Sequence, residues 1–140
     1  MIWGPFYTLD QIKIENVQRI ATRMVVSIKH LSYEQRLQRL GLPTLKYRRQ
    51  RGDMICVFSL FNNIYDLDYF QFFTMAGSVS TRGHPFKLFK PQLLHDVKSH
   101  AFSQRVINDW NKLDSDIVTA PTLSIFKRLY DQCCSDNYCI

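Results

Sequence analysis

Four histidines and four cysteines are the residues of this 140-residue chain that could bind a metal ion or serve as bases and nucleophiles. None of the histidines stands in a motif such as HExxH, which places two ligands one helical turn apart. The cysteines form no CxxC pair, and adjacent cysteines rarely supply two corners of a tetrahedral zinc site. We therefore expect no metal, no cofactor and reduced thiols. The residues considered are His30, His84, His95, His100, Cys56 (expected in the core), Cys133, Cys134 and Cys139.

One pair of carboxylates stands in Tyr65-Asp66-Leu67-Asp68. This phrase is similar to the YxDD motif of polymerases, but a leucine separates the two aspartates. Two-metal catalysis needs ions about 4 Å apart, and the true motif holds them with neighbouring aspartates. No glycine-rich phosphate loop accompanies the pair. We interpret both acids as solvated residues near a helix start and expect that the isolated chain is not an enzyme.

Arginine is the residue type that the sequence concentrates in one segment. Residues 1–52 contain ten Lys/Arg and three Asp/Glu, whereas residues 53–140 contain eight and nine, so the net charge of +6 arises in the first third. Arginine makes bidentate phosphate contacts that lysine cannot. The asymmetry indicates a polyanionic partner, with a merely solvating face as the alternative. The candidate nucleic-acid-binding residues are Arg19, Arg23, Arg36, Arg39, Arg48, Arg49 and Arg51.

Three helices with short links are predicted to position these arginines. The first begins at a capping box of Thr8 with Gln11 and presents Arg19 and Arg23 opposite its apolar face. The second begins at Ser32 and ends at Gly41, and the third begins at Pro43. The residues expected to face inward are Ile14, Val17, Ala21, Met24 and Ile28, then Leu37 and Leu40, then Tyr47, Met54, Phe58 and Phe61, while Arg36, Arg39, Arg48 and Arg49 are expected to face outward.

The predicted fold class is mainly α. Residues 1–64 should form a three-helix bundle, residues 65–97 an irregular connector, and residues 98–140 a tail with two further helices. The connector is expected to contain a short helix near 65–73, a loop at 77–83 and an extended strap at 86–89, and Trp110 is expected in the core. No apolar run is long enough to span a membrane, so we expect an intracellular chain, in the nucleus or cytoplasm, without a membrane partner.

Several phrases of the sequence, taken in order, resemble the reverse transcriptases of non-LTR retrotransposons, of the jockey-like and chicken-repeat-like LINE families. Residues 15–23 resemble the phrase E-x-x-Q-R-R-A-T-R, with Ile20 in place of the second arginine. The resemblance continues in Arg39-Leu40-Gly41-Leu42-Pro43-Thr44-Leu45, in Arg51-Gly52-Asp53-Met54-Ile55 and in residues 102–111. The last residues, 133–140, match nothing in that family.

The resemblance implies a thumb that follows a polymerase palm and grips the backbone of the template–primer RNA/DNA duplex, or of an RNA duplex, followed by a C-terminal extension. It also implies that the palm and fingers, which carry the catalytic aspartates, lie upstream of Met1. The chain would then be a C-terminal fragment of an RNA-directed DNA polymerase without catalytic residues of its own, and the palm and fingers would be its protein partners. The alternative is a protein–protein docking module that uses the aromatic residues of 65–73.

Overall fold

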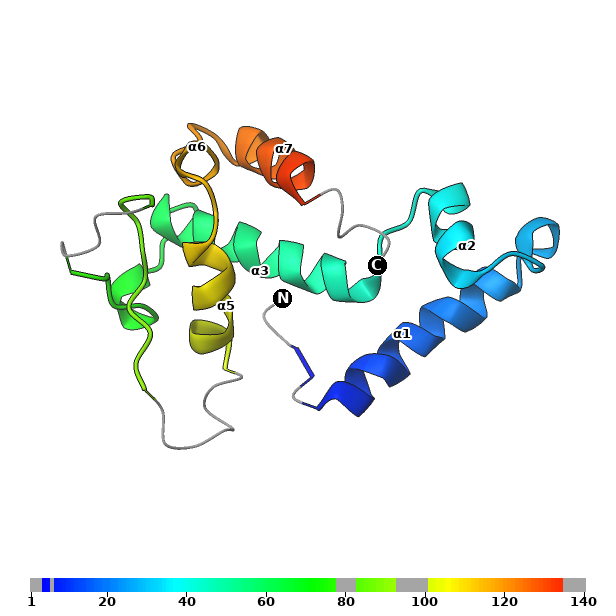
Figure 1. Ribbon diagram of the computed structural model, residues 1–140. Helices are drawn as coiled ribbons and strands as arrows, with labels where there is room; N and C mark the ends of the chain where they lie inside the picture. Colours follow the sequence, from blue (N-terminus) through cyan, green and yellow to red (C-terminus); the bar gives the residue numbers. More distant parts are fainter. Residues whose placement is uncertain (1–3, 6, 78–82, 93–100, 135–140) are drawn as a thin grey trace.

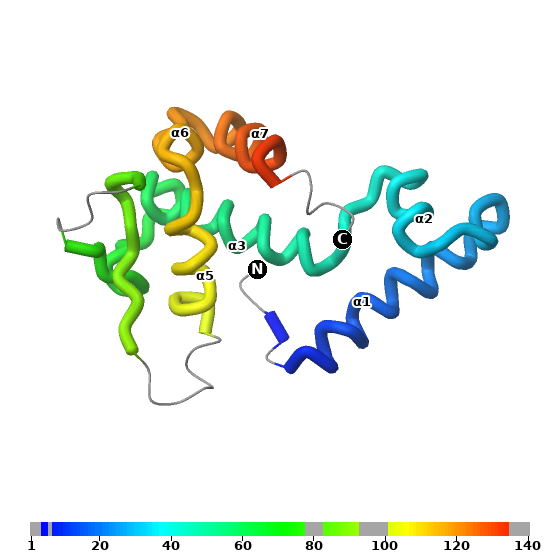
Figure 2. The backbone as a smooth tube through the Cα atoms, in the orientation of Figure 1, coloured from blue at the N-terminus to red at the C-terminus, as the bar shows by residue number. Residues whose placement is uncertain are grey.

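The computed structural model describes residues 4–5, 7–77, 83–92 and 101–134, and it is mainly α, as predicted. Helix α3 runs along the middle of the molecule, with α1 and α2 at one end, α5 and α6 toward the other, and α7 alongside α3 (Figure 1). The tube drawing in Figure 2 shows the same division of the helices about α3. The helices are α1 (Thr8–Arg23), α2 (Tyr33–Leu40), α3 (Leu45–Phe61), α5 (Phe102–Asn111), α6 (Ser115–Val118) and α7 (Leu123–Cys133), with the 3₁₀ helices η1 (Val26–Ile28) and η2 (Tyr69–Gln71).

The hydrophobic core lies where α3 packs against α5 and α7. Phe58 of α3 stacks on Phe126 of α7 with ring centroids 4.3 Å apart, and Phe61 stacks on Trp110 of α5 at 5.4 Å. Trp110 is fully buried, as predicted. Burial of such large aromatic rings is the main stabilising contribution here. This core contains residues from all three predicted segments, 1–64, 65–97 and 98–140.

Local capping signals set the ends of α2, α3 and α7. Ser32 and Gln35 form the predicted capping box, and Gly41 ends α2 in the left-handed region at φ 62°. Helix α7 begins after Thr122, whose side chain accepts a hydrogen bond from the Ile125 amide. The predicted start of α3 at Pro43 is wrong, because the Thr44 side chain caps the helix by accepting from the Tyr47 amide.

The prediction for α1 is wrong in three respects. Helix α1 ends at Arg23, so Ile28 belongs to η1. Thr8 is the first residue inside α1 and is not its N-cap; the N-cap is Tyr7, whose side chain makes no capping hydrogen bond. Most of the predicted apolar face is turned outward, with Val17 66% and Met24 75% exposed, and Ile14 is its half-buried member in α1. The packed face is mainly polar, and Thr22 is its one fully buried residue. Side-chain hydrogen bonds to α2 and α3 therefore contribute to the orientation of this helix more than its predicted apolar face does.

The predicted extended strap is confirmed. An antiparallel bridge joins Met75 to Leu88, and the Ala76 amide donates to the Lys87 carbonyl at 2.8 Å. Asn111 of α5 fastens the strap, because its amide nitrogen donates to the Leu88 carbonyl and its amide oxygen accepts from the Leu88 amide, both at 2.8 Å. The short helix expected near 65–73 is η2. Residues 78–82 of the expected loop, with His95, His100 and Cys139, lie outside the described residues.

Candidate nucleic-acid interface

Three arginines line one groove between α1 and α2. The groove has a volume of about 470 Å³, and Arg19, Arg23 and Arg36 supply its charge. None of its lining residues, all in the described part of the chain, is a carboxylate. Such a concentration of guanidinium groups attracts a polyanion. The remaining lining residues are Asn16, Ile20, Leu31, Ser32 and Tyr33.

Arg36 forms the floor of this groove and corrects the expectation that it faces outward. It is only 6% exposed because the Arg36 side chain folds back between α1 and α2. Its Nε donates to Thr22 Oγ1 at 3.2 Å, Nη1 donates to the Leu31 carbonyl at 2.7 Å, and Nη2 donates to the Arg19 carbonyl at 3.4 Å. All three acceptors are uncharged, so they satisfy the hydrogen bonding of the guanidinium without neutralising its positive charge, which the exposed Glu34 offsets only from a distance.

Tyr33 forms one wall of the groove. The Arg19 guanidinium lies 4.8 Å from the Tyr33 ring centroid and that of Arg36 lies 5.8 Å away, both within cation–π range. The Tyr33 hydroxyl donates to Glu15 Oε1 at 2.5 Å. Burial, and then this hydrogen bond, raise the pKa of Tyr33, so the phenol stays protonated at neutral pH. The ring thus fixes the position of Arg19 without adding negative charge.

Glu15 is a residue whose role the sequence did not reveal. Its Oε2 accepts from the Leu45 amide at 3.0 Å and from the Lys46 amide at 3.3 Å. These amides belong to the first turn of α3, where a carboxylate is stabilised by unpaired N–H groups and the helix dipole. The contact spans 30 residues, so no local motif signals it. Glu15 is thereby occupied inside the fold. The exposed Glu34 still acts on the groove, because hydrogen bonds to its own backbone amide and to Ser32, and then the charges of Arg19 and Arg36, lower the pKa of its carboxyl.

The other four candidate arginines lie outside the groove. Arg39 and Arg48 are exposed, as predicted. Arg49 is half-buried and lines a separate polar pocket near Asp53 and Asp109. Arg51 makes a bidentate ion pair with Asp131 of α7, with Nε–Oδ1 at 2.5 Å and Nη2–Oδ2 at 2.8 Å. The structure therefore brings together Arg19, Arg23 and Arg36, and it uses Arg51 to join α3 to α7.

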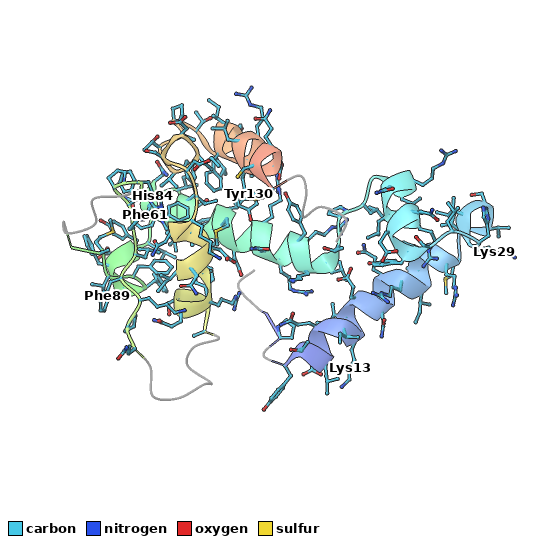
Figure 3. The ribbon with its side chains drawn as sticks, in the orientation of Figure 1. Lys13, Lys29, Phe61, His84, Phe89 and Tyr130 are labelled. Carbon is cyan, nitrogen blue, oxygen red and sulfur yellow. The ribbon has the colours of Figure 1, made fainter. Side chains whose placement is uncertain are left out.

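The residues considered for catalysis lie apart from this groove. Asp66 is exposed, and the exposed Asp68 caps η2 by accepting from the Phe70 amide. His84 is buried with its Nε2 3.1 Å from the Trp110 carbonyl, and burial lowers the pKa of its imidazole. Figure 3 shows His84 and Phe61 among the closely packed side chains near α3 and α5, whereas Lys13 and Lys29 project outward at the α1–α2 end. Within the described ranges, no three His, Cys, Asp or Glu side chains converge as metal ligands.

Comparison with protein-family models, curated proteins and solved structures finds no match for this chain. Among the helices of the described residues, none combines the length and the apolar character that crossing a membrane requires.

Proposed function

We propose that the chain binds the phosphate backbone of an RNA/DNA or RNA duplex through the α1–α2 groove. In this proposal it is the thumb-like C-terminal part of an RNA-directed DNA polymerase and has no catalytic residues of its own. The observation that carries the proposal is the convergence of Arg19, Arg23 and Arg36 in a groove lined, among the described residues, by no carboxylate. The sequence resemblance to retrotransposon reverse transcriptases supports the same kind of partner.

The geometry favours contacts to the backbone over the reading of bases. Arg19 and Arg23 are one helical turn apart on α1, where two like charges repel unless an anion lies between them. Arg39 and Arg48 are exposed on the neighbouring helices α2 and α3. In this proposal these exposed arginines contact phosphates near the groove, and phosphate contacts fix position without selecting sequence.

Salt dependence of duplex affinity tests this proposal. With about four phosphates contacted, the logarithm of the association constant should fall against the logarithm of salt concentration with a slope of about −3 to −4. The double variant Arg19→Ala/Arg23→Ala should reduce the magnitude of that slope by about 2, because two contacts are lost. The measurement is fluorescence anisotropy of a labelled RNA/DNA hybrid over a series of salt concentrations.

The matched control removes the same charge at the other end of the molecule. Lys127→Ala/Arg128→Ala on α7 should leave the slope within error of that of the parent chain, because α7 does not contribute to the groove. Equal slopes for the parent and the Arg19/Arg23 variant, or no binding at low salt, would refute the proposal. If the slope decreases equally in both variants, binding depends on net charge alone.

A second candidate function is protein docking through exposed aromatic side chains near η2. Tyr65 is 50% exposed, Phe70 64% and Phe89 53%, which is high for side chains of this size. Contiguous exposed apolar surface is typical of interaction sites. Light scattering separates the two candidates, because concentration-dependent association that Phe70→Ser abolishes, without any duplex binding, would favour docking.

A further inference from the structure

Helix α1 carries an apolar stripe on the face that points away from the rest of the protein. Leu9, Val17, Ile20 and Met24, with Lys13 in the same row, follow one another at spacings of four, four, three and four residues. These spacings place side chains on one helical face. Leu9 is 71% exposed and Ile20 60% exposed, and Val26 of η1, which follows α1, is 74% exposed. The row from Leu9 to Met24 extends over about 22 Å, the length of some four helical turns.

The opposite face of α1 shows that this exposure is built into the fold. Gln18 Nε2 donates to the Pro43 carbonyl at 2.9 Å, and Thr22 and Glu15 bond to α2 and α3 as described above. These specific contacts hold the polar face inward, so α1 cannot rotate to bury its stripe without breaking them. A large apolar row kept in water in this way is typical of a site that another molecule covers.

The charges around the stripe select among possible occupants. Lys13, Arg23 and Lys29 are exposed beside it, whereas Asp10 is already engaged by Lys13 at 3.2 Å and Glu15 is held by α3. The surface is therefore cationic, and a second copy of this chain, itself +6, would bring like charges together. An occupant with carboxylates beside its apolar residues would pair with these cations instead.

The position of Lys13 favours a protein helix over a lipid surface. Lys13 lies in the middle of the row, between Leu9 and Val17, and projects outward in Figure 3. On a membrane this ammonium group would be pressed toward the apolar phase, which is unfavourable. A partner helix can place one carboxylate opposite Lys13 while its own apolar side chains cover the positions on either side. The exposed Lys13–Asp10 pair is of the weak surface class and can exchange readily.

We propose that the α1 stripe is a docking site for an amphipathic helix of another protein, or of another domain, that carries acidic residues beside its apolar face. The docked helix would lie along α1 with its apolar residues on Val17, Ile20 and Met24 and a carboxylate on Lys13. Ile20 also lines the arginine groove, so the docked helix would border bound nucleic acid. The inference does not depend on duplex binding, because it rests on the exposed apolar side chains of α1 and not on its arginines.

The test selects helical peptides on the intact chain. The probe is a displayed library of peptides of about 18 residues, roughly five turns, with leucine fixed at the stripe spacing and Glu, Lys, Gln or Ser at each flanking position. We expect Glu to be enriched beside the apolar row. The recovered peptides should lose about tenfold or more in affinity for Val17→Ser/Ile20→Ser, a change of at least about 1.4 kcal/mol. The variant Lys13→Glu should shift the selection from Glu to Lys.

Phe89→Ser is the matched control, because it removes an equally exposed apolar side chain at the other end of the molecule and should leave peptide affinity unchanged. All the altered side chains are exposed, and circular dichroism of each variant verifies that its helices remain. No Glu preference, undiminished binding to Val17→Ser/Ile20→Ser, or an equal loss in Phe89→Ser would overturn the proposal. So would dimerisation of the chain, or binding to phosphatidylserine vesicles, that the stripe variant abolishes.

Discussion

At the residue scale, Arg36 combines a structural and an electrostatic role. Its three hydrogen bonds join α2 to α1, and their acceptors are all neutral, so the guanidinium charge adds to the groove, where the exposed Glu34 offsets part of it. A buried guanidinium is costly to desolvate, and its hydrogen bonds offset that cost only when their geometry is good. An anion in the groove would add to the countercharge of Glu34. The free energy of folding and the affinity for a phosphate should therefore both depend on this one side chain.

Replacing Arg36 tests its structural role. Arg36→Met keeps most of the aliphatic volume but removes the guanidinium donors, so Thr22 Oγ1 and the carbonyl oxygens of Leu31 and Arg19 each lose one hydrogen bond. We expect the free energy of unfolding to fall by about 2 kcal/mol, whereas Arg39→Met, at an exposed position of α2, should stay within about 0.5 kcal/mol. Urea denaturation followed by far-ultraviolet circular dichroism measures both. Equal stability of the two variants would mean that desolvation of the guanidinium cancels its hydrogen bonds.

At the scale of elements, α3 and α7 are joined by an ion pair that makes their packing depend on pH. The hydrogen bond from Arg51 is the main cause that lowers the pKa of Asp131, and the Tyr47 hydroxyl, 3.1 Å from Asp131 Oδ1, acts in the same direction. Because the pKa is lower in the folded than in the unfolded chain, the carboxylate stabilises the fold above its unfolded pKa of about 3.9. That stabilisation is lost as the pH falls through the folded pKa.

The variant Asp131→Asn should therefore be less stable than the parent at pH 7, and the difference should shrink as the solution is acidified below about pH 4. The measurement is the urea midpoint over a series of pH values. Asp116→Asn, at an exposed position of α6, provides the control and should show a constant difference from the parent. A gap between Asp131→Asn and the parent that stays constant down to pH 2 would contradict the assigned role of the Arg51 pair.

Elements set by local chemistry could be predicted from the sequence, and those set by distant contacts could not. The start of α2 at Ser32 and the helix after Thr122 follow from side chains three residues from the amides they cap. The orientation of α1 depends on Glu15 and Gln18, whose partners lie 25 to 31 residues away. Hydrophobic periodicity alone favoured the other face. In the candidate site, the same limit explains why Arg19 and Arg23 were placed correctly at the surface while Arg36 was not.

At the scale of the whole molecule, α3 meets its neighbours through two kinds of interaction. It packs through buried aromatic rings against α5 and α7 along much of its length, from Tyr47 to Phe61. At its N-terminus it meets α1 through the Glu15 carboxylate and backbone amides, and α1 itself buries only Thr22 fully. Regions with few buried apolar contacts have a smaller free energy of local opening than the core. We therefore expect α1 and α2 to open locally while α3, α5 and α7 remain folded.

Removing Glu15 should expose this difference. Glu15→Ala leaves the Leu45 and Lys46 amides without their charged acceptor, and hydrogen bonds to charged groups contribute about 1.5–3 kcal/mol. Amides of α1 and α2 should then exchange with deuterium about tenfold faster or more, while those of α5 change little. Mass spectrometry of peptides from both ends measures this, with Asp10→Ala on the same helix as the control. Equally accelerated deuterium exchange in α5 would show that the molecule unfolds as one unit. If adding an RNA/DNA hybrid slows the exchange of the α1 amides again, this local opening is linked to nucleic-acid binding.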